Sequence, residues 1–316
     1  MIIVTGSNGF IGSNLIKGLN SMGIKDILAV DDHEKLPPSE NLSNCEFKDL
    51  IKIEDIAELL RNYPTNDITH IFHQGACSDT MEKDINYMIK NNYLFSKDLL
   101  TLALEKNINF IYASSASVYG DGKIFEEDKK YEKPINLYAY SKFIFDQYVR
   151  ELINKTDSQI VGLRYFNVYG PNEQHKGRMA SVAFHLHQQL KESQSIKLFE
   201  GSDGYEDGEQ KRDFIHVDDV VKVNLWFMKN EVSGIFNVGT GVSQSFNDVA
   251  NAVINWNKKG KIEYIPFPEE LIGSYQSYTQ ANIDRLRNAG YKDEFLTVEE
   301  GVSSYLNSLH NWPSND

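Results

Sequence analysis

A tyrosine and a lysine four residues apart are the side chains of this chain best placed for acid–base chemistry. Tyr138 and Lys142 are one helical turn apart, so on a helix both project from the same face. A cation near a phenol favours the phenolate, which lowers the pKa of the tyrosine toward the range of a general acid or base. Tyr140 has no lysine four residues later, so we expect Tyr138 to react and Lys142 to tune it.

Hydroxyl side chains follow the apolar run Phe110–Ser114. Ser115 comes next in the chain, where a parallel sheet presents the carboxyl ends of its strands to a ligand. We expect Ser115 to share a hydrogen bond with the reacting oxygen. The alternative for any one of these serines is a role in the turn itself.

A glycine-rich turn after the first apolar run predicts a dinucleotide site. Gly6, Gly9 and Gly12 depart from the usual G-x-G-x-x-G spacing, but they lie between an expected strand and an expected helix. Glycines permit the tight turn and the close approach of a pyrophosphate, which backbone N–H groups and the helix dipole then bind. The sequence therefore predicts binding of a nicotinamide dinucleotide.

Opposite charges near the second strand leave the choice between NAD and NADP open. Asp31 ends this strand and Asp32 follows, and a carboxylate there binds ribose hydroxyls and repels a 2′-phosphate, which favours NAD. Lys35 and Lys52 are close enough in sequence to neutralise a 2′-phosphate instead.

The elements that must position these residues alternate through the first half of the chain, as in βαβ units on a parallel sheet. The expected strands are Ile2–Thr5, Ile27–Asp31, Ile68–His73, Phe110–Ser114 and Ile160–Tyr165. The expected helices are Phe10–Met22, Ile53–Asn62, Asn86–Lys106 and Tyr138–Ile153, whose apolar residues recur every three or four positions. This pattern predicts an α/β fold, a Rossmann-type doubly wound parallel sheet with a smaller C-terminal substrate domain.

Regularity weakens after Tyr165, with a helix expected over Ala180–Glu192, another over Val217–Lys229 and a strand over Gly234–Gly239. The chain is therefore expected to return to the first domain before it ends. We assign residues 1–166 and about 213–240 to the dinucleotide domain, and residues 167–212 and 241–316 to the substrate domain.

Composition limits the partners. The net charge of −13 and the pI near 5.1 argue against nucleic acid and anionic membrane surfaces, so an anionic ligand needs local cations. Cys45 and Cys77 have no metal or redox spacing, no apolar run is long enough to span a bilayer, and the N-terminus lacks a basic leader. These features predict reduced thiols and a cytoplasmic protein.

The remaining histidines predict no metal site. His185 and His187 are two residues apart and would point in different directions from a helix. His70 and His73 fall near a strand end and are interpreted as packing or turn residues. Cys77, without a flanking cysteine, is interpreted as a small apolar side chain.

Several long strings resemble the extended short-chain dehydrogenases/reductases, the NAD-dependent epimerase/dehydratase family, in which serine, tyrosine and lysine form the reaction centre. Within that family the strings are most similar to those of the 6-epimerases of ADP-heptose, which supply the heptose of lipopolysaccharide core. The strings are Gln74–Ser78, Arg164–Pro171, His175–Gly177, Met179–His185 and Phe199–Ser202.

The resemblance implies three sets of site residues. The reaction centre would be Ser115, Tyr138, Lys142 and Lys176. The cofactor site, implied to hold NADP with NAD as the alternative, would comprise Gly6, Gly9, Phe10, Ile11, Gly12, Asp31, Asp32, Lys52, Gln74, Gly75, Ala76, Cys77, Ser78, Asn91, Tyr138, Lys142 and Val168. The substrate site would comprise Asn167, Arg178, His185, Phe199, Glu200, Gly201, Ser202, Arg212 and Tyr275. A homo-oligomer, such as a pentamer, is also implied.

Two features depart from the family pattern. Arg178 stands where a small hydroxyl residue is expected, and the Asp203–Gln210 loop is several residues longer than expected. Both concern the pocket for the substrate diphosphate, where Lys176, Arg178, Lys211 and Arg212 would supply the cations.

The implied reaction inverts a secondary alcohol: hydride leaves C6″ of the sugar for the nicotinamide and returns to the opposite face. Such a reaction needs an acid/base on each side, and Tyr138 and Lys176 are the candidates. A dehydratase would need an acidic pair after Ser115, where Ala116 and Ser117 stand instead. A 4-epimerase and a non-catalytic NAD(P)-binding sensor remain the alternatives.

Overall fold

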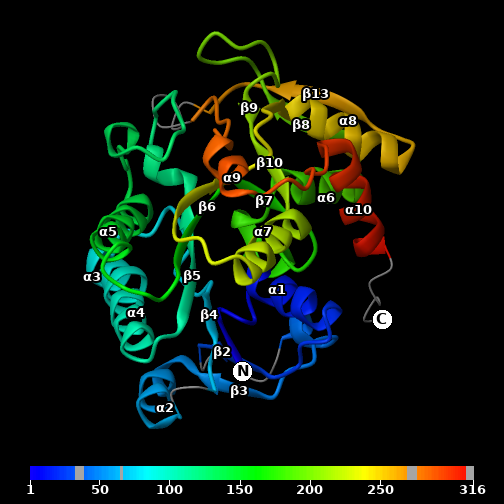
Figure 1. Cartoon of the computed structure of the whole chain (residues 1–316). Coiled ribbons are helices and arrows are strands. Elements are labelled where there is room, and N and C mark those ends of the chain that lie inside the picture. Colours follow the sequence, from blue (N-terminus) through cyan, green and yellow to red (C-terminus); the bar gives the residue numbers. More distant parts are fainter. Residues whose placement is uncertain (33–38, 65–66, 269–275, 311–316) are drawn as a thin grey trace.

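A seven-stranded parallel sheet forms the centre of the computed structural model, which describes residues 1–32, 39–64, 67–268 and 276–310 (Figure 1). Its strand order is β11-β6-β5-β4-β1-β2-β3. The order changes direction between β1 and β4, where this class of sheet binds ligands. The strands are β1 (Ile2–Thr5), β2 (Ile27–Asp31), β3 (Asp49–Lys52), β4 (His70–His73), β5 (Asn109–Ser115), β6 (Ile160–Tyr165) and β11 (Gly234–Val238). The predicted doubly wound α/β fold is confirmed.

Helices cover both faces of the sheet, and alternate strand residues face each layer. Along β1, Ile2 and Val4 pack with α1 (Phe10–Ser21) and α7 (Val217–Lys229), whereas Ile3 packs with the helices of the other face. Those helices are α2 (Ile56–Asn62), α4 (Phe95–Glu105) and α5 (Leu137–Leu152). Burial on both faces explains why the central strands are continuous apolar runs.

Two elements differ from the sequence prediction. β3 was not predicted, because this edge strand is only half-buried and carries polar residues at both ends. The single helix expected over 86–106 is divided into α3 (Ile85–Met88), a π-helical segment η4 (Ile89–Leu94) and α4. π-Helical turns are frequent at functional sites, and this one presents Asn92 to the loop after β4.

A separate apolar core lies beyond the carboxyl ends of the central strands. It is built on α6 (Val182–Glu192), α8 (Phe246–Asn257) and α10 (Val298–His310). The strands here pair as β8 (Ser195–Phe199) with β13 (Lys261–Ile265), β7 (Asn167–Tyr169) with β10 (Phe214–His216), and β9 (Lys211–Arg212) with β12 (Gln244–Ser245). Between these segments the chain passes through β11 of the main sheet, where the sequence predicted a strand over Gly234–Gly239.

Short elements complete the described chain. They are η2 (Glu40–Leu42), η3 (Ile53–Asp55), η5 (Ala116–Tyr119), η6 (Lys129–Tyr131), η7 (Gln174–Met179) and α9 (Asp284–Ala289). None of the helices in the described ranges combines the length and the apolar character that a bilayer crossing requires.

Candidate active site

Glycine is required at two positions of the turn between β1 and α1. Gly6 has a φ of +67°, and a Cβ atom there would lie 2.6 Å from the backbone nitrogen of Gly75. A Cβ atom on Gly12 would lie 2.1 Å from the carbonyl oxygen of Gly6. The turn therefore packs backbone to backbone against the loop after β4, and its glycines allow this close contact.

Asp31 holds this turn through its own carboxylate. One oxygen accepts the backbone N–H of Asn8 at 2.7 Å, and the other accepts the N–H of Asp32 at 2.8 Å. Asp32 is exposed, and Lys52 lies beside Asp31 in the paired strand β3. An acidic and a basic side chain are thus neighbours where the sequence predicts the adenosine ribose, whereas Lys35 lies outside the described residues.

Asn92 fixes the loop Gln74–Ser78, and the sequence did not identify it. Its side chain is 1% exposed, accepts the N–H of Cys77 at 2.8 Å and donates to the carbonyl oxygen of Cys77 at 2.9 Å. It also donates to the hydroxyl of Ser141 on α5 at 3.0 Å. Asn91, which was predicted to contact the cofactor, is half-buried beside it on η4. One indication of this role lies in the sequence: Asn92 directly follows Asn91, which was expected to contact the cofactor.

The structure brings Tyr138 and Ser115 together. Asn136 caps α5 by accepting the N–H of Ala139 at 2.8 Å, which places Tyr138 in the first turn of the helix. The Tyr138 phenol hydrogen-bonds the side chain of Ser115 at the end of β5. Ser115 is oriented in turn, because its oxygen accepts from the hydroxyl of Ser117 at 2.9 Å.

The expected lowering of the Tyr138 pKa by Lys142 is wrong for this structure. Burial raises the pKa of Tyr138, and the hydrogen bond with Ser115 only partly offsets it. The ammonium of Lys142 instead donates to the carbonyl oxygen of Ala113 at 2.8 Å. Burial lowers the pKa of Lys142 to about 8, since its side chain is shielded from water.

Lys176 lies against the start of α1, next to the glycine turn. Its nitrogen is 5.1 Å from the centre of the Phe10 ring, at the start of α1, and burial lowers the pKa of Lys176. The helix α1 covers one face of the sheet and α5 the other. Lys176 thus contacts the helix of one face, whereas Tyr138 lies on the helix of the other.

Two asparagines attach the segment that carries Lys176 to the cofactor turn. Asn14 on α1 donates to the carbonyl oxygen of Pro171 at 2.8 Å. Asn41 donates to the carbonyl oxygens of Asn8 at 3.0 Å and Asn172 at 3.2 Å. The position of Lys176 is thus set by contacts with α1 and the turn before it.

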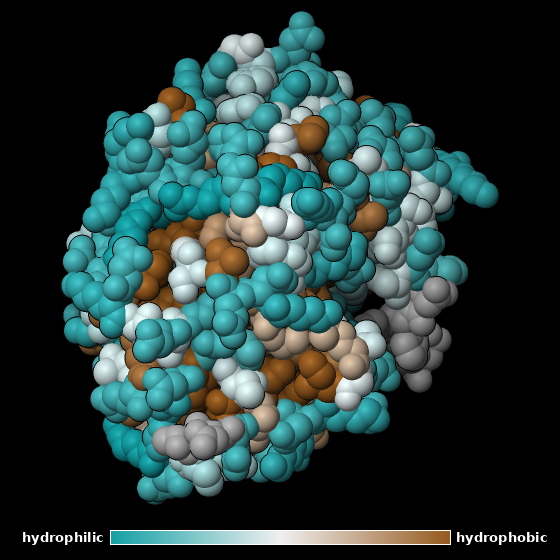
Figure 2. Space-filling model, in the orientation of Figure 1, coloured by the Kyte–Doolittle hydropathy of each residue, from teal (hydrophilic) through white to brown (hydrophobic). Residues whose placement is uncertain are grey.

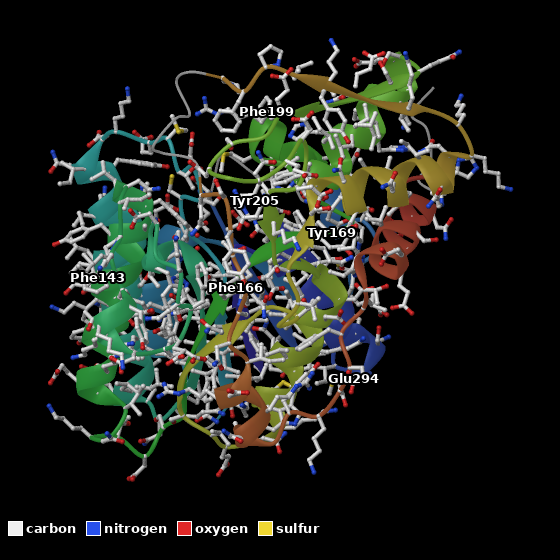
Figure 3. The ribbon with its side chains drawn as sticks, turned by 90° about the horizontal axis from the view of Figure 1, so that it is seen from above. Phe143, Phe166, Tyr169, Phe199, Tyr205 and Glu294 are labelled. Carbon is white, nitrogen blue, oxygen red and sulfur yellow. The ribbon has the colours of Figure 1, made fainter. Side chains whose placement is uncertain are left out.

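The predicted substrate residues are dispersed along the second lobe. Asn167 is exposed on β7, Val168 and His185 are half-buried, and buried Arg212 stacks on Phe246 at 5.5 Å. Figure 3 shows Phe199 at the end of β8, away from Phe166, which lies near the middle of the molecule. Tyr275 lies outside the described residues.

The long loop after Phe199 folds back on the segment predicted to bind substrate. Gly201 donates its N–H to the carboxylate of Asp207 at 2.8 Å, and Gln210 donates to the hydroxyl of Ser202 at 3.1 Å. Residues of the long loop thus bind the Phe199–Ser202 segment through their own side chains.

Arg178, the residue that departs from the family pattern, is exposed and pairs with Asp79 at 2.8 Å. Asp79 follows the loop Gln74–Ser78, so this ion pair joins the cofactor side to the segment of Lys176.

Asp213 ties the two lobes together at the base of the site. Its buried carboxylate accepts the N–H groups of Thr240 at 2.7 Å, Gly241 at 2.9 Å and Ala281 at 2.9 Å. Asp213 was not predicted from the sequence, because nothing in a lone aspartate after two cations distinguishes a buried anchor from a surface charge.

A separate cavity of about 460 Å³ lies between α5, β11 and α9, where Figure 2 shows apolar side chains in a hollow. Two of its polar lining residues already have partners within the protein. Glu127 accepts the N–H of Asn237 at 2.7 Å, and Arg150 pairs with Glu132. None of the predicted site residues lines it.

Comparison with known proteins matches this geometry to one family. The model of the NAD dependent epimerase/dehydratase family matches residues 2–239. An ADP-L-glycero-D-manno-heptose-6-epimerase from Helicobacter pylori is 32% identical, with a TM-score of 0.83, 98% of this chain covered and 96% of that chain. A UDP-glucose 4-epimerase from Thermotoga maritima, solved with UDP-glucose, is 24% identical with a TM-score of 0.81 and 98% of each chain covered. At 22% identity, a UDP-glucose 4-epimerase from Thermus thermophilus, solved with NAD, has a TM-score of 0.79 and 99% of each chain covered.

Proposed function

This chain belongs to the NAD dependent epimerase/dehydratase family, and we propose that it inverts C6″ of ADP-D-glycero-β-D-manno-heptose to give the L-glycero epimer. The observation that carries the proposal is the 32% identity to the heptose epimerase over nearly all of both chains. The two 4-epimerases are less similar and indicate the fold alone.

The residues at the carboxyl edge of the sheet fit a nicotinamide dinucleotide. The glycine turn leads into the N-terminus of α1, whose backbone N–H groups would bind a pyrophosphate, and the Lys142 ammonium donates to Ala113 of β5, the strand that ends at Ser115 beside Tyr138. A bound NAD(P) supplies one property, the reversible acceptance of a hydride from the carbinol carbon. Lys52 beside Asp31 favours NADP in this proposal, with NAD as the alternative.

Tyr138 and Lys176 carry the protons in this mechanism. One of them would take the O–H proton as the carbinol carbon is oxidised to a ketone, and the other would give a proton to that oxygen when the ketone is reduced from its other face. The hydride removed in the first step is returned in the second, so no net oxidation would occur. The contact of Lys176 with α1 and the position of Tyr138 on α5, helices of opposite sheet faces, support this scheme, and burial of Lys176 lowers its pKa toward that of a working acid/base.

The proposal also includes the domain division, the oligomeric state, the location and the biological role predicted from the sequence. The lobes would divide at residues 1–166 and about 213–240 for the cofactor and 167–212 and 241–316 for the sugar nucleotide. A homo-oligomer such as a pentamer, a cytoplasmic location and a role in supplying lipopolysaccharide heptose stay predictions.

Incubation with ADP-D-glycero-D-manno-heptose, with C6″ followed by NMR, tests the proposal. The parent protein should invert C6″, and Tyr138→Phe and Lys176→Met should each lower the rate by about two to four orders of magnitude. Tyr140→Phe removes an exposed phenol two residues away and should leave the rate unchanged. Folded, cofactor-loaded protein that leaves C6″ unchanged but converts UDP-glucose to UDP-galactose would replace the proposal with a 4-epimerase.

A parent rate in Lys176→Met would contradict the two-base scheme while leaving the substrate assignment intact. Tyr138 alone would then have to serve both faces of the ketone. An aldehyde analogue at C6″ can be oxidised and reduced without rotation of a ketone in the site. With this analogue each single variant should retain one productive orientation, and the double variant should retain neither.

A further inference from the structure

His73 connects the cofactor turn to the helices behind the site. It ends β4, and its side chain is 3% exposed between the rings of Phe95 and Phe110. Both ring nitrogens have partners: Nδ1 is 2.7 Å from the hydroxyl of Thr5, and Nε2 is 2.8 Å from the hydroxyl of Ser96. This double pairing goes beyond the packing role that the sequence indicated.

The direction of each hydrogen bond follows from the carbonyl group at one end. Ser96 donates its hydroxyl proton to the carbonyl oxygen of Asn92 at 2.7 Å, because a carbonyl oxygen only accepts. The Ser96 oxygen must therefore accept from Nε2 of His73, which carries a proton. In a neutral imidazole Nδ1 is then bare, so Thr5 donates to it.

Burial keeps His73 neutral. It lowers the pKa of His73 to about 3, and the nearby ammonium of Lys142 acts in the same direction. A single tautomer, protonated at Nε2, therefore holds through the physiological pH range.

Both ends of this chain of hydrogen bonds reach the loop Gln74–Ser78. At one end Thr5 accepts the N–H of Gly75 at 3.2 Å. At the other, the side chain of Asn92 binds both backbone groups of Cys77 and also Ser141, whose hydroxyl donates to the carbonyl oxygen of Tyr138 at 2.7 Å. From Gly75 through Thr5, His73 and Ser96 to the carbonyl oxygen of Asn92, each donor points toward the next acceptor.

We propose that His73 is a positioning residue, which as a fixed Nε2–H tautomer holds the loop Gln74–Ser78 and the glycine turn in register with the first turn of α5. It touches neither the reacting atoms nor the sugar and acts through Thr5 and Ser96. The inference rests on the dinucleotide-binding part of the proposed function and is independent of which sugar nucleotide reacts.

The tautomer is measured directly by NMR of protein labelled with ¹⁵N-histidine, with His73→Asn used to assign the signal. We expect one protonated nitrogen, Nε2, with shifts that stay constant from pH 5 to pH 9. Protonation at Nδ1, or a titration between pH 5 and pH 8, overturns the proposal. This test uses the parent protein and so does not depend on the folding of a variant.

The affinity of variants for NAD(P) tests whether these hydrogen bonds hold the dinucleotide site in place. Thr5→Val keeps the shape of the side chain but removes the donor to Nδ1 and the acceptor for Gly75, and it should weaken NAD(P) binding by about tenfold or more. Ser96→Ala should have a similar effect, and Thr5→Ser should restore most of the affinity because it returns the hydroxyl. Thr101→Val is the matched control, since the Thr101 hydroxyl is exposed and bonds only within α4.

Equal affinity in Thr5→Val and Thr5→Ser contradicts the proposal. A merely structural role would lower the melting temperature of Thr5→Val in proportion to affinity and would not be rescued selectively by the hydroxyl. Binding is measured without sugar, so a parent protein that binds NAD(P) but fails to epimerise heptose leaves this inference standing. A parent that binds no dinucleotide removes the proposed function, whereas the NMR result still decides the tautomer.

Discussion

Lys142→Met should make the cofactor-free protein more stable at neutral pH while it weakens catalysis. Lys142 is 6% exposed, and its ammonium has one hydrogen bond, to the carbonyl oxygen of Ala113. Burial lowers the pKa of Lys142 to about 8, because a charge shielded from water is poorly solvated. A methionine of similar length removes the charge and keeps the packing.

The size of the stability change follows from the difference between the pKa of Lys142 in the unfolded chain and its pKa in the folded protein. The unfolded chain gives Lys142 its ordinary pKa of 10.5 and the folded protein about 8, a difference worth about 3 kcal/mol against the folded state below pH 8. Loss of the hydrogen bond to Ala113 offsets about 1 kcal/mol. The net expectation is a gain of about 2 kcal/mol in the free energy of unfolding at pH 7.

The sign of the pH dependence separates this explanation from simple repacking. Between pH 8 and pH 10.5 the unfolded state binds more protons at Lys142 than the folded state, so the parent gains stability as pH rises. The advantage of Lys142→Met should therefore shrink across this range, whereas Lys142→Arg stays charged and should show no recovery.

Urea denaturation of the three cofactor-free proteins at several pH values measures this, and comparing variants at each pH cancels the other alkaline titrations. The reasoning is refuted if Lys142→Met is less stable than the parent at pH 7, or if the difference between them is constant from pH 8 to pH 10.5. Activity of Lys142→Met equal to that of the parent would show that the buried charge has no catalytic purpose.

Three further changes probe the anchors of the site. Asp213→Asn puts an amide donor against backbone N–H groups and should cost about 2–5 kcal/mol in urea denaturation, whereas the same change at exposed Asp284 should cost almost nothing. Gly6→Ala requires a Cβ atom 2.6 Å from the Gly75 nitrogen, so titration calorimetry should detect little NAD(P) binding; parent-like affinity would contradict this close contact between the turn and the loop. Lys52→Ala should weaken NADP about tenfold and leave NAD unchanged, and equal losses for both would remove Lys52 from the 2′-phosphate.

Much of the fold follows from the order of apolar runs, because strands buried on both faces leave a strong signal. The strand predicted at Ile27–Asp31 has the same bounds in the structure. β3 could not be found in this way, since it is held by pairing with β2 rather than by its own burial. The π-helical segment η4 was equally hidden, because its register is set by the hydrogen bonds of Asn92 to a loop distant in sequence.

The sequence pointed to the reactive side chains of the candidate site but not to the residues that hold them in place. Tyr138 and Ser115 were identified because their types and positions are those of an acid–base pair, and they meet in the structure. The expected effect of Lys142 on Tyr138 failed for a physical reason: helical spacing places two side chains on one face, but it carries no information about burial, which dominates both pKa values. Supporting groups such as Asp213 are defined by partners that only the fold reveals.

Hydrogen bonds, together with the backbone of the glycine turn, connect the backbone of Tyr138 on α5 with the segment that carries Lys176. From Tyr138 the path runs through Asn92 and His73 to Thr5 at the end of β1. From the turn that follows Thr5, Asn41 continues it to the segment that carries Lys176. In the proposed reaction a ketone turns between two protonation sites whose separation has to stay constant, and buried hydrogen bonds between rigid elements provide this better than side-chain contacts in a loop. A break in the middle, at His73, should therefore disturb both faces of the reaction, whereas a break at Asn41 should disturb only the protonation by Lys176.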